Sequence, residues 1–155
     1  MEASEQEIRW AADADDVQGA LAVREEVFCR EQGVPREEEI DGRDGEALHL
    51  VALAAGDGRV IGTLRLLIDP GAAKVGRVAV ERDWRGRGIA SRMLELALAA
   101  AREQGCARVR LAAQLTATGV YRRAGFQVES EPFEDAGIQH VWMGLRLMRR
   151  HPGDR

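Results

Sequence analysis

Apolar residues recur along this chain with two different periods, and the change between them predicts where helices and strands lie. The first strand candidate is the short run Ile8 to Ala11. After it, a series of apolar side chains recurs at helical spacing, at Val17, Ala20, Leu21, Val27 and Phe28. Asp13 is a natural residue to cap the start of this helix, while Gly33 and Pro35 are natural residues to end it. We therefore expect a helix from about residue 13 to residue 32.

From Leu48 onward the apolar residues form short runs separated by turn residues, which is typical of strands. The runs cover residues 48–54, 60–68 and 73–80. Gly56-Asp57-Gly58 supplies the first turn between them and Pro70-Gly71 the second. Three consecutive strands joined by tight turns are expected here.

A second helix is predicted from about Gly88, because a broad apolar face repeats through Ile89, Met93, Leu94, Leu96, Ala97, Leu98 and Ala100. Gly105 ends it, and residues 107–113 alternate as a strand does. A short helix over about 116–124, a strand to Glu129 and a last strand over about 138–147 complete the chain. The pattern predicts an α/β fold in one domain over residues 1–155, with a mixed central sheet, helices on both faces and a loose tail at 149–155.

Composition limits the classes of protein to which the chain can belong. It has 155 residues, a net charge of −4, 45% hydrophobic residues and no apolar run near the roughly 20 residues that span a bilayer. The first ten residues are polar and acidic, unlike a secretory signal. We therefore expect a cytoplasmic protein with no membrane or nucleic-acid partner. Cys29 and Cys106 are expected to be free core thiols, and no cysteine and histidine spacing suggests a metal site.

Residues 34–47 form a polar segment punctuated by glycine, of the length at which loops are usually functional or disordered. We expect the run Glu37-Glu38-Glu39 to be a solvated face. Asp41 and Asp44 are expected to act mainly as turn residues.

The strand that ends at Val80 is followed by a glycine-rich corner, Arg85-Gly86-Arg87-Gly88-Ile89-Ala90, which opens the long helix. Gly86 and Gly88 let the backbone approach a ligand closely, and the first turn of a helix offers unpaired N–H groups. This combination predicts an anion site for a phosphate or pyrophosphate. The alternative is a tight turn whose glycines only ease packing.

Two motifs, in this order, resemble the GNAT acetyltransferase superfamily. Arg85-x-x-Gly88-x-Ala90 matches the Gln/Arg-x-x-Gly-x-Gly/Ala loop that holds the pyrophosphate of acetyl-CoA in that family. Tyr121-Arg122-Arg123-Ala124-Gly125-Phe126 is similar to its Tyr-x-x-x-Gly-Phe, in which the tyrosine protonates the departing thiolate. The corner is neither a Walker loop nor a complete dinucleotide-binding fingerprint. The alternative for Tyr121 is a core aromatic residue.

A third resemblance, to ElaA-type acetyltransferases, extends over about residues 20 to 147. In the N-terminal half it depends on Phe28, Glu31, Gln32, Pro35, Asp41, Asp44, His49 and Leu50. In the C-terminal half it depends on Ala113-Gln114 and on Glu134-Asp135-x-Gly137-Ile138-x-His140. The chain departs from that group by the extra Ala136 and by Gln139 in place of proline.

The resemblance implies a GNAT fold and direct acetyl transfer from acetyl-CoA to an amine in a ternary complex. It implies that the pyrophosphate is bound by the corner residues Arg85, Gly86, Arg87, Gly88, Ile89, Ala90 and Ser91. It also implies that the pantetheine arm lies along Val78, Ala79 and Val80, with the N–H of Val80 polarising the thioester carbonyl. Tyr121 would complete this site as the general acid.

The acceptor is expected to be a small-molecule or peptide amine whose identity the sequence does not reveal. Glu31 and His49 are the leading candidates for the general base, and His140 is the third. Together with Gln32 they are the expected substrate-binding residues, and an acidic rim would favour a cationic amine. Assembly into a homodimer is left open. The competing functions are an acyl-homoserine-lactone synthase, which takes its acyl group from a carrier protein, and a catalytically silent CoA-binding module.

Overall fold

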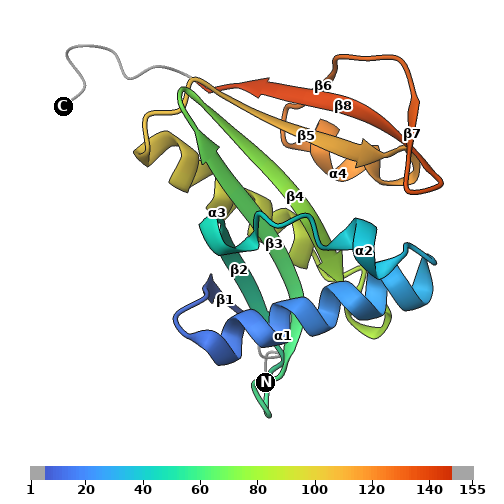
Figure 1. Ribbon diagram of the computed structural model, residues 1–155. Helices are drawn as coiled ribbons and strands as arrows, with labels where there is room; N and C mark the ends of the chain where they lie inside the picture. Colours follow the sequence, from blue (N-terminus) through green and yellow to red (C-terminus); the bar gives the residue numbers. More distant parts are fainter. Residues whose placement is uncertain (1–5, 148–155) are drawn as a thin grey trace.

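The computed structural model describes residues 6–147, which form one mixed eight-stranded sheet with helices on both faces (Figure 1). The strand order is β1-β2-β3-β4-β5-β8-β6, with β7 paired to β8 outside this path. Neighbouring strands are antiparallel, except for the parallel pair β4 and β5. The strands are β1 (Glu7–Trp10), β2 (Leu48–Leu53), β3 (Val60–Asp69), β4 (Ala72–Val80), β5 (Arg108–Gln114), β6 (Gln127–Val128), β7 (Phe133–Asp135) and β8 (Ile138–Arg146).

The helical segments are α1 (Ala14–Arg24), the π-helical η1 (Glu25–Glu31), α2 (Arg36–Glu39), η2 (Asp44–Glu46), η3 (Arg82–Trp84), α3 (Ile89–Glu103), η4 (Leu115–Ala117) and α4 (Thr118–Arg123). The expected order of elements is therefore confirmed, and α2, β7 and the short 3₁₀ turns are additions to it. Each addition has three or four residues, which is too short to produce a recognisable period. The predicted loose tail lies outside the described residues.

The first helix begins as expected, because the Asp13 carboxylate accepts a hydrogen bond from the Asp16 N–H at 2.9 Å. Its last two turns are π-helical: the Gln32 N–H donates to the Val27 carbonyl five residues earlier, at 3.2 Å. Gly33 then takes a φ of +75°, which favours glycine and ends the helix. The sequence predicts the length of this helix but not the change in its winding.

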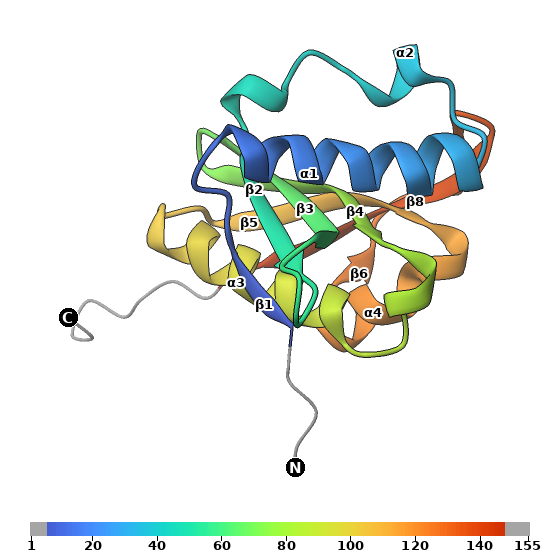
Figure 2. The ribbon, with the colours of Figure 1, turned by 90° about the horizontal axis from the view of Figure 1, so that it is seen from below.

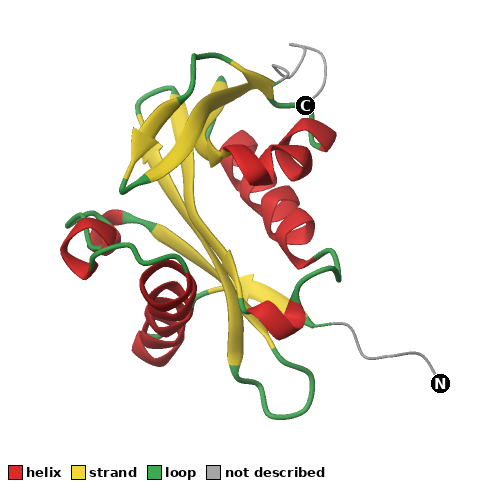
Figure 3. Cartoon of the chain, turned by 90° about the vertical axis from the view of Figure 1, so that its right-hand side faces the viewer, coloured by secondary structure: helices red, strands yellow, loops and turns green. Residues whose placement is uncertain are grey.

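The two faces of the sheet are covered differently (Figures 2 and 3). α3 and α4 cover one face, where the main core forms around Leu64, Leu66, Met93 and Leu111. α1 and α2 lie over the other face, where Ala20 packs against the buried side chains of β2. Within residues 6–147 there is no helix long and apolar enough to cross a membrane.

β4 and β5 separate soon after they meet, and this separation creates the space for a site. They pair only from Ala72 to Lys74 on β4, opposite residues 108–110 of β5, and then diverge (Figure 1). β4 is also bulged, because three steps from Gly76 to Ala79 face only two steps of β3. Arg77, inside the bulge, has a φ of +50°. Beyond the divergence, one edge of β4 has no neighbouring strand among residues 6–147.

Candidate active site

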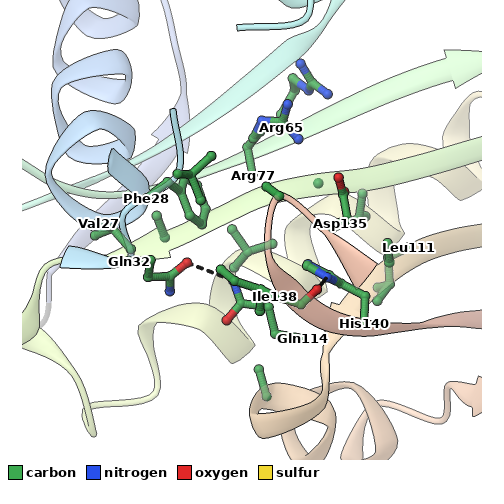
Figure 4. A pocket seen from close by; sticks show the side chains of 18 of the residues that line it. Val27, Phe28, Gln32, Arg65, Arg77, Leu111, Gln114, Asp135, Ile138 and His140 are labelled. Atoms are coloured by element: carbon green, nitrogen blue, oxygen red, sulfur yellow. Dashed lines mark hydrogen bonds between the residues drawn. The ribbon is translucent and has the colours of Figure 1, made fainter. Parts of the chain in front are cut away.

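A cavity of about 350 Å³ lies where β4 and β5 diverge, within the usual size range of small-molecule sites. Its wall combines η1, β4, β5, α4 and the hairpin formed by β7 and β8. Figure 4 shows Val27, Phe28 and Gln32 on one side of the cavity, facing Gln114, Ile138 and His140 on the other. The Gln114 amide donates to Gln32 Oε1 at 2.9 Å and so bridges the two sides.

The free edge of β4 presents backbone groups to this cavity. Glu81 donates its N–H to the Ile61 carbonyl on β3 at 2.9 Å, and strand residues alternate in the direction of their backbone groups. The N–H and C=O of the preceding residue, Val80, therefore point away from β3 and into the space between β4 and β5. Val80 lines the cavity, so its N–H is available to a bound carbonyl oxygen.

The glycine-rich corner adjoins this edge and has the geometry of an anion site. Gly86 and Gly88 have φ values of +77° and +78°, and a Cβ added at either would meet no atom within 4 Å. Gly88 is the residue that precedes α3, and no side chain caps this helix. The N–H groups of the first turn, which contains Ile89, Ala90 and Ser91, are thus open to a ligand.

The arginines of the corner have partners within the protein. Both terminal nitrogens of Arg85 contact the Glu31 carboxylate at 2.7 Å, and its Nε donates to the Val80 carbonyl at 2.8 Å. Arg87 lies over the Trp84 ring, 4.6 Å from the ring centre. Arg85 therefore ties η1 to the end of β4, and it also lines the cavity.

Tyr121 lies on α4 and lines the cavity, with 8% of its surface exposed. Phe126 packs edge-on against its ring at 6.1 Å between ring centres. Burial raises the pKa of the Tyr121 hydroxyl to about 12, because an ionised phenolate would be poorly solvated there. The side chain therefore holds its proton at neutral pH and remains a potential proton donor.

Comparison with known proteins identifies the family. The model of the acetyltransferase (GNAT) domain matches residues 3–147. The chain belongs to the GNAT acetyltransferase family. An uncharacterized N-acetyltransferase of Bacillus subtilis, YjcF, is 36% identical over 135 residues, which cover 86% of this chain and 94% of that protein.

Solved structures agree with the assignment of the chain to the GNAT family. An acyl-CoA N-acyltransferase from Pseudomonas aeruginosa is 31% identical, with a TM-score of 0.79, and the match covers 90% of this chain and 99% of that one. Escherichia coli ElaA is 24% identical, with a TM-score of 0.78 over 89% of this chain and 98% of its own, a likeness of fold. The resemblance to ElaA found in the sequence thus extends to the three-dimensional structure.

The structure separates the three residues considered as general base in this GNAT protein. His140 lines the cavity. The Glu31 carboxylate is held by Arg85, whose hydrogen bonds lower the pKa of Glu31. His49 is buried outside the cavity, with Nε2 3.0 Å from the Asp44 carbonyl. The expected convergence of these side chains is therefore not found: of the three, only His140 reaches the cavity wall.

His49 has a structural environment. Its Nε2 must carry the hydrogen, because a carbonyl oxygen only accepts, so Nδ1 is left as an acceptor. Nδ1 has no partner, and neither has Nε of Arg65, the residue opposite His49 across the β2–β3 pair. The two unpaired atoms are a donor and an acceptor on facing residues.

Two expectations about the polar segment 34–47 require correction. Glu37 and Glu38 are exposed as expected, but Glu39 is buried, and it contacts the fully buried Arg24 at 2.8 Å and Arg77 at 2.7 Å. Asp41 does form a turn with the Arg43 N–H, but it also binds Arg65 at 2.8 Å. Asp44 bridges Arg24 and Arg65, at 2.8 and 3.1 Å. Carboxylates near a buried arginine are drawn inward because the arginine requires counter-ions.

Sequence reasoning missed the residues that form the rest of the cavity wall, among them Arg65, Lys74, Arg77, Phe133 and Trp142. One signal for them was visible: Arg65 interrupts an otherwise apolar strand, and a charge at an inward position calls for a partner or a function. Phe133 and Trp142 stack at 5.8 Å between ring centres across the β7–β8 hairpin. That hairpin was not predicted, so its contribution could not be anticipated.

Proposed function

We propose that this chain is an acetyl-CoA-dependent N-acetyltransferase that transfers the acetyl group directly to an amine. The observation that carries the proposal is the free edge of β4, where the Val80 N–H faces the same cavity as the protonated hydroxyl of Tyr121. Such an arrangement suits a thioester, whose carbonyl oxygen needs a hydrogen-bond donor and whose sulfur needs a proton on departure.

Each part of the site has a role in this proposal. The backbone N–H groups from Arg85 to Ser91 bind the pyrophosphate. The backbone of Val78 to Val80 pairs with the pantetheine arm, as it would with an additional strand. The acceptor nitrogen attacks the carbonyl carbon while the Val80 N–H stabilises the developing oxyanion. As the carbon–sulfur bond breaks, Tyr121 donates its proton to the sulfur, and a base takes the proton of the amine.

His140 is our candidate for that base, in preference to Glu31 and His49. Its Nδ1 lies 2.7 Å from the Ile138 carbonyl, which only accepts hydrogen bonds, so in the neutral ring Nδ1 carries the hydrogen and Nε2 the lone pair. Phe133 stacks on the ring at 5.9 Å and fixes its orientation. Glu31 is held by two hydrogen bonds from Arg85, and His49 does not reach the cavity.

Direct transfer is favoured over a covalent acyl-enzyme by the state of the two thiols. Cys29 and Cys106 do not line the cavity, and burial raises the pKa of both. A thiol that holds its proton is a poor nucleophile. The amine itself is therefore the attacking group in our proposal.

The function is tested by thiol release from acetyl-CoA in the presence of amines, amino acids, polyamines and peptides. We expect thiol release that depends on the presence of an amine. His140→Gln should lower kcat/KM for this release by about 100-fold. His49→Gln serves as the control, with turnover near that of the wild type. A thermal shift with acetyl-CoA but no release with any amine would identify a silent CoA-binding module instead.

A further inference from the structure

Lys74, the only lysine of the chain, lines the cavity at the point where β4 and β5 stop pairing. Its side chain is partly buried, and its Nζ lies 5.4 Å from the centre of the Trp142 ring. Burial, followed by the nearby charges of Arg65 and Arg77, lowers its pKa. Within the part of the chain that the structure describes, Lys74 forms no ion pair.

The arginines beside Lys74 already have counter-ions, and this distinguishes them from the lysine. Arg65 is bound to Asp41 at 2.8 Å, and Arg77 to Glu39 at 2.7 Å. Glu39 is buried and also contacts Arg24, whereas Asp41 is partly exposed and bound to Arg65 without contacting Arg24. The ammonium of Lys74 is thus a partly desolvated cation that lacks a counter-ion, an arrangement that an anionic ligand would stabilise.

The other charges of the cavity wall do not balance Lys74. The carboxylates of the cavity wall are Glu39, which is buried and paired with Arg77, and Glu38 and Asp135, which are exposed. The carboxylate that does act on Lys74 is Asp41, which raises the pKa of the lysine but is already bound to Arg65 at 2.8 Å. Among the described residues, the carboxylates of the cavity wall are thus either exposed or already paired, whereas the cation Lys74 is partly buried, next to the stacked rings of Phe133 and Trp142.

The distance along β4 between Lys74 and Val80 indicates the length of a ligand that reaches both residues. Val80, where the acetyl group is expected, lies six positions after Lys74 on β4. At 3.3 Å for each residue this is roughly 20 Å of strand, reduced by the bulge and by the length of the lysine side chain. A free α-amino acid is too short for this span, whereas a short peptide is long enough.

We propose that the acceptor is an elongated amine with an anionic group at its far end, which Lys74 binds. This inference rests on the proposed acetyl transfer, and it departs from the expectation that an acidic rim would favour a cationic amine. The apolar middle of such an acceptor lies against Phe133 and Trp142. A carboxylate and a phosphate satisfy Lys74 equally well, since an ammonium acts as a point charge without the planar geometry of a guanidinium.

The test uses acceptors of matched length with and without the anion. One pair is a tripeptide with a free carboxylate and the same tripeptide as its C-terminal amide. The other is an ω-aminoalkyl phosphate and the corresponding amino alcohol. We expect the wild type to prefer the anionic member of at least one pair by about 10- to 100-fold in kcat/KM, the range of a hydrogen bond to a charged group. Which pair shows the preference identifies carboxylate or phosphate.

Variants then assign the preference to Lys74. Lys74→Gln should remove the preference for the anionic member of each pair, while Lys74→Arg should keep most of it. Arg110→Gln is the matched control, because Arg110 also lies over Trp142, at 4.7 Å, but is 44% exposed. Its loss should leave the preference intact.

Calorimetric binding of the same four acceptors in the presence of CoA separates two kinds of failure. Anion-dependent binding that is lost in Lys74→Gln, without turnover, would support the inference while overturning the proposed transfer. Equal binding and equal turnover of the anionic and neutral members by the wild type would overturn the inference while leaving acetyl transfer intact.

Discussion

At the scale of single residues, the role of Tyr121 depends on its burial and on one hydroxyl group. Replacing it with phenylalanine keeps the packing against Phe126 and removes only the proton donor. We expect Tyr121→Phe to lower kcat by about 100-fold while the dissociation constant of acetyl-CoA changes little. Single-turnover kinetics measures the first quantity and calorimetry the second. Wild-type turnover in this variant, with chemistry rate-limiting, would leave Tyr121 as a core aromatic residue.

The raised pKa of Tyr121 predicts the behaviour of the enzyme in alkali. An unperturbed tyrosine ionises near pH 10, whereas burial raises the pKa of this one to about 12. The acid form is therefore retained to higher pH than in an exposed tyrosine. We therefore expect the pH profiles of kcat/KM for the wild type and Tyr121→Phe to have the same shape near pH 10, with no decrease that only the wild type shows. A decrease near pH 10 in the wild type alone would contradict the raised pKa of Tyr121.

At the scale of elements, the glycine-rich corner should bind acetyl-CoA through its backbone. A ligand at 100 times its dissociation constant adds about 2.7 kcal/mol to the free energy of unfolding. Gly88→Val should abolish this gain, because a branched side chain would occupy the space above the first turn of α3. Thermal unfolding with and without acetyl-CoA measures the effect.

A control is needed because valine at a positive φ strains the backbone whatever surrounds it. Gly58, in the turn between β2 and β3, has a φ of +69° and equally open surroundings, and it does not line the cavity. Gly58→Val should lower stability by a similar amount but keep the gain from acetyl-CoA. An unchanged gain in Gly88→Val would rule out the corner as the pyrophosphate site.

The segment that contains α2 is held to the rest of the fold by buried charges. Arg24 on α1 is fully buried and binds both Glu39 and Asp44. Removing one member of a buried ion pair leaves its partner uncompensated and typically costs about 3–5 kcal/mol. We expect Arg24→Leu to lower the free energy of unfolding by about that amount, measured by urea denaturation.

Arg30→Leu is the matched control for this variant. Arg30 pairs with Glu26 at 3.3 Å, and both side chains are exposed. Exposed pairs contribute between 0 and about 1 kcal/mol, because water already solvates both charges. A similar loss of stability in the two variants would show that the buried ion pairs of Arg24 contribute no more to the free energy of unfolding than an exposed pair does.

At the scale of the whole molecule, the ion pairs predict how stability depends on pH. Hydrogen bonds from arginine partners lower the pKa of Asp16, Glu31 and Asp41. A carboxylate with a lowered folded-state pKa stabilises the fold above its unfolded pKa, near pH 4. That contribution is lost as the pH falls through the folded-state value.

We therefore expect the free energy of unfolding to decrease steadily below about pH 4, as measured by urea denaturation at a series of pH values. Asp41→Asn should be less stable than the wild type at pH 7 and should lose less on acidification, because an amide does not titrate. Parallel curves for the two proteins would exclude Asp41 as a contributor.

Much of the architecture could be predicted because it depends on residues close together in the sequence. The apolar period of residues 89–100 produced α3, and the turns at Gly56-Asp57-Gly58 and Pro70-Gly71 produced the three-stranded meander. Elements of three or four residues, such as α2 and β7, were missed because they have no period of their own. They form only because the surrounding structure offers partners for their side chains and backbone.

The sequence by itself determined the order of the elements, the glycine-rich corner and membership of the GNAT family, because these depend on local spacing and on short motifs. The tertiary structure decided which residues share the cavity. It excluded His49, tied Glu31 to Arg85, buried Glu39 and brought Lys74 beside Trp142. These outcomes depend on contacts between segments distant in the chain, of η1 with the corner, of α1 with α2 and of β4 with β8, which no local pattern records.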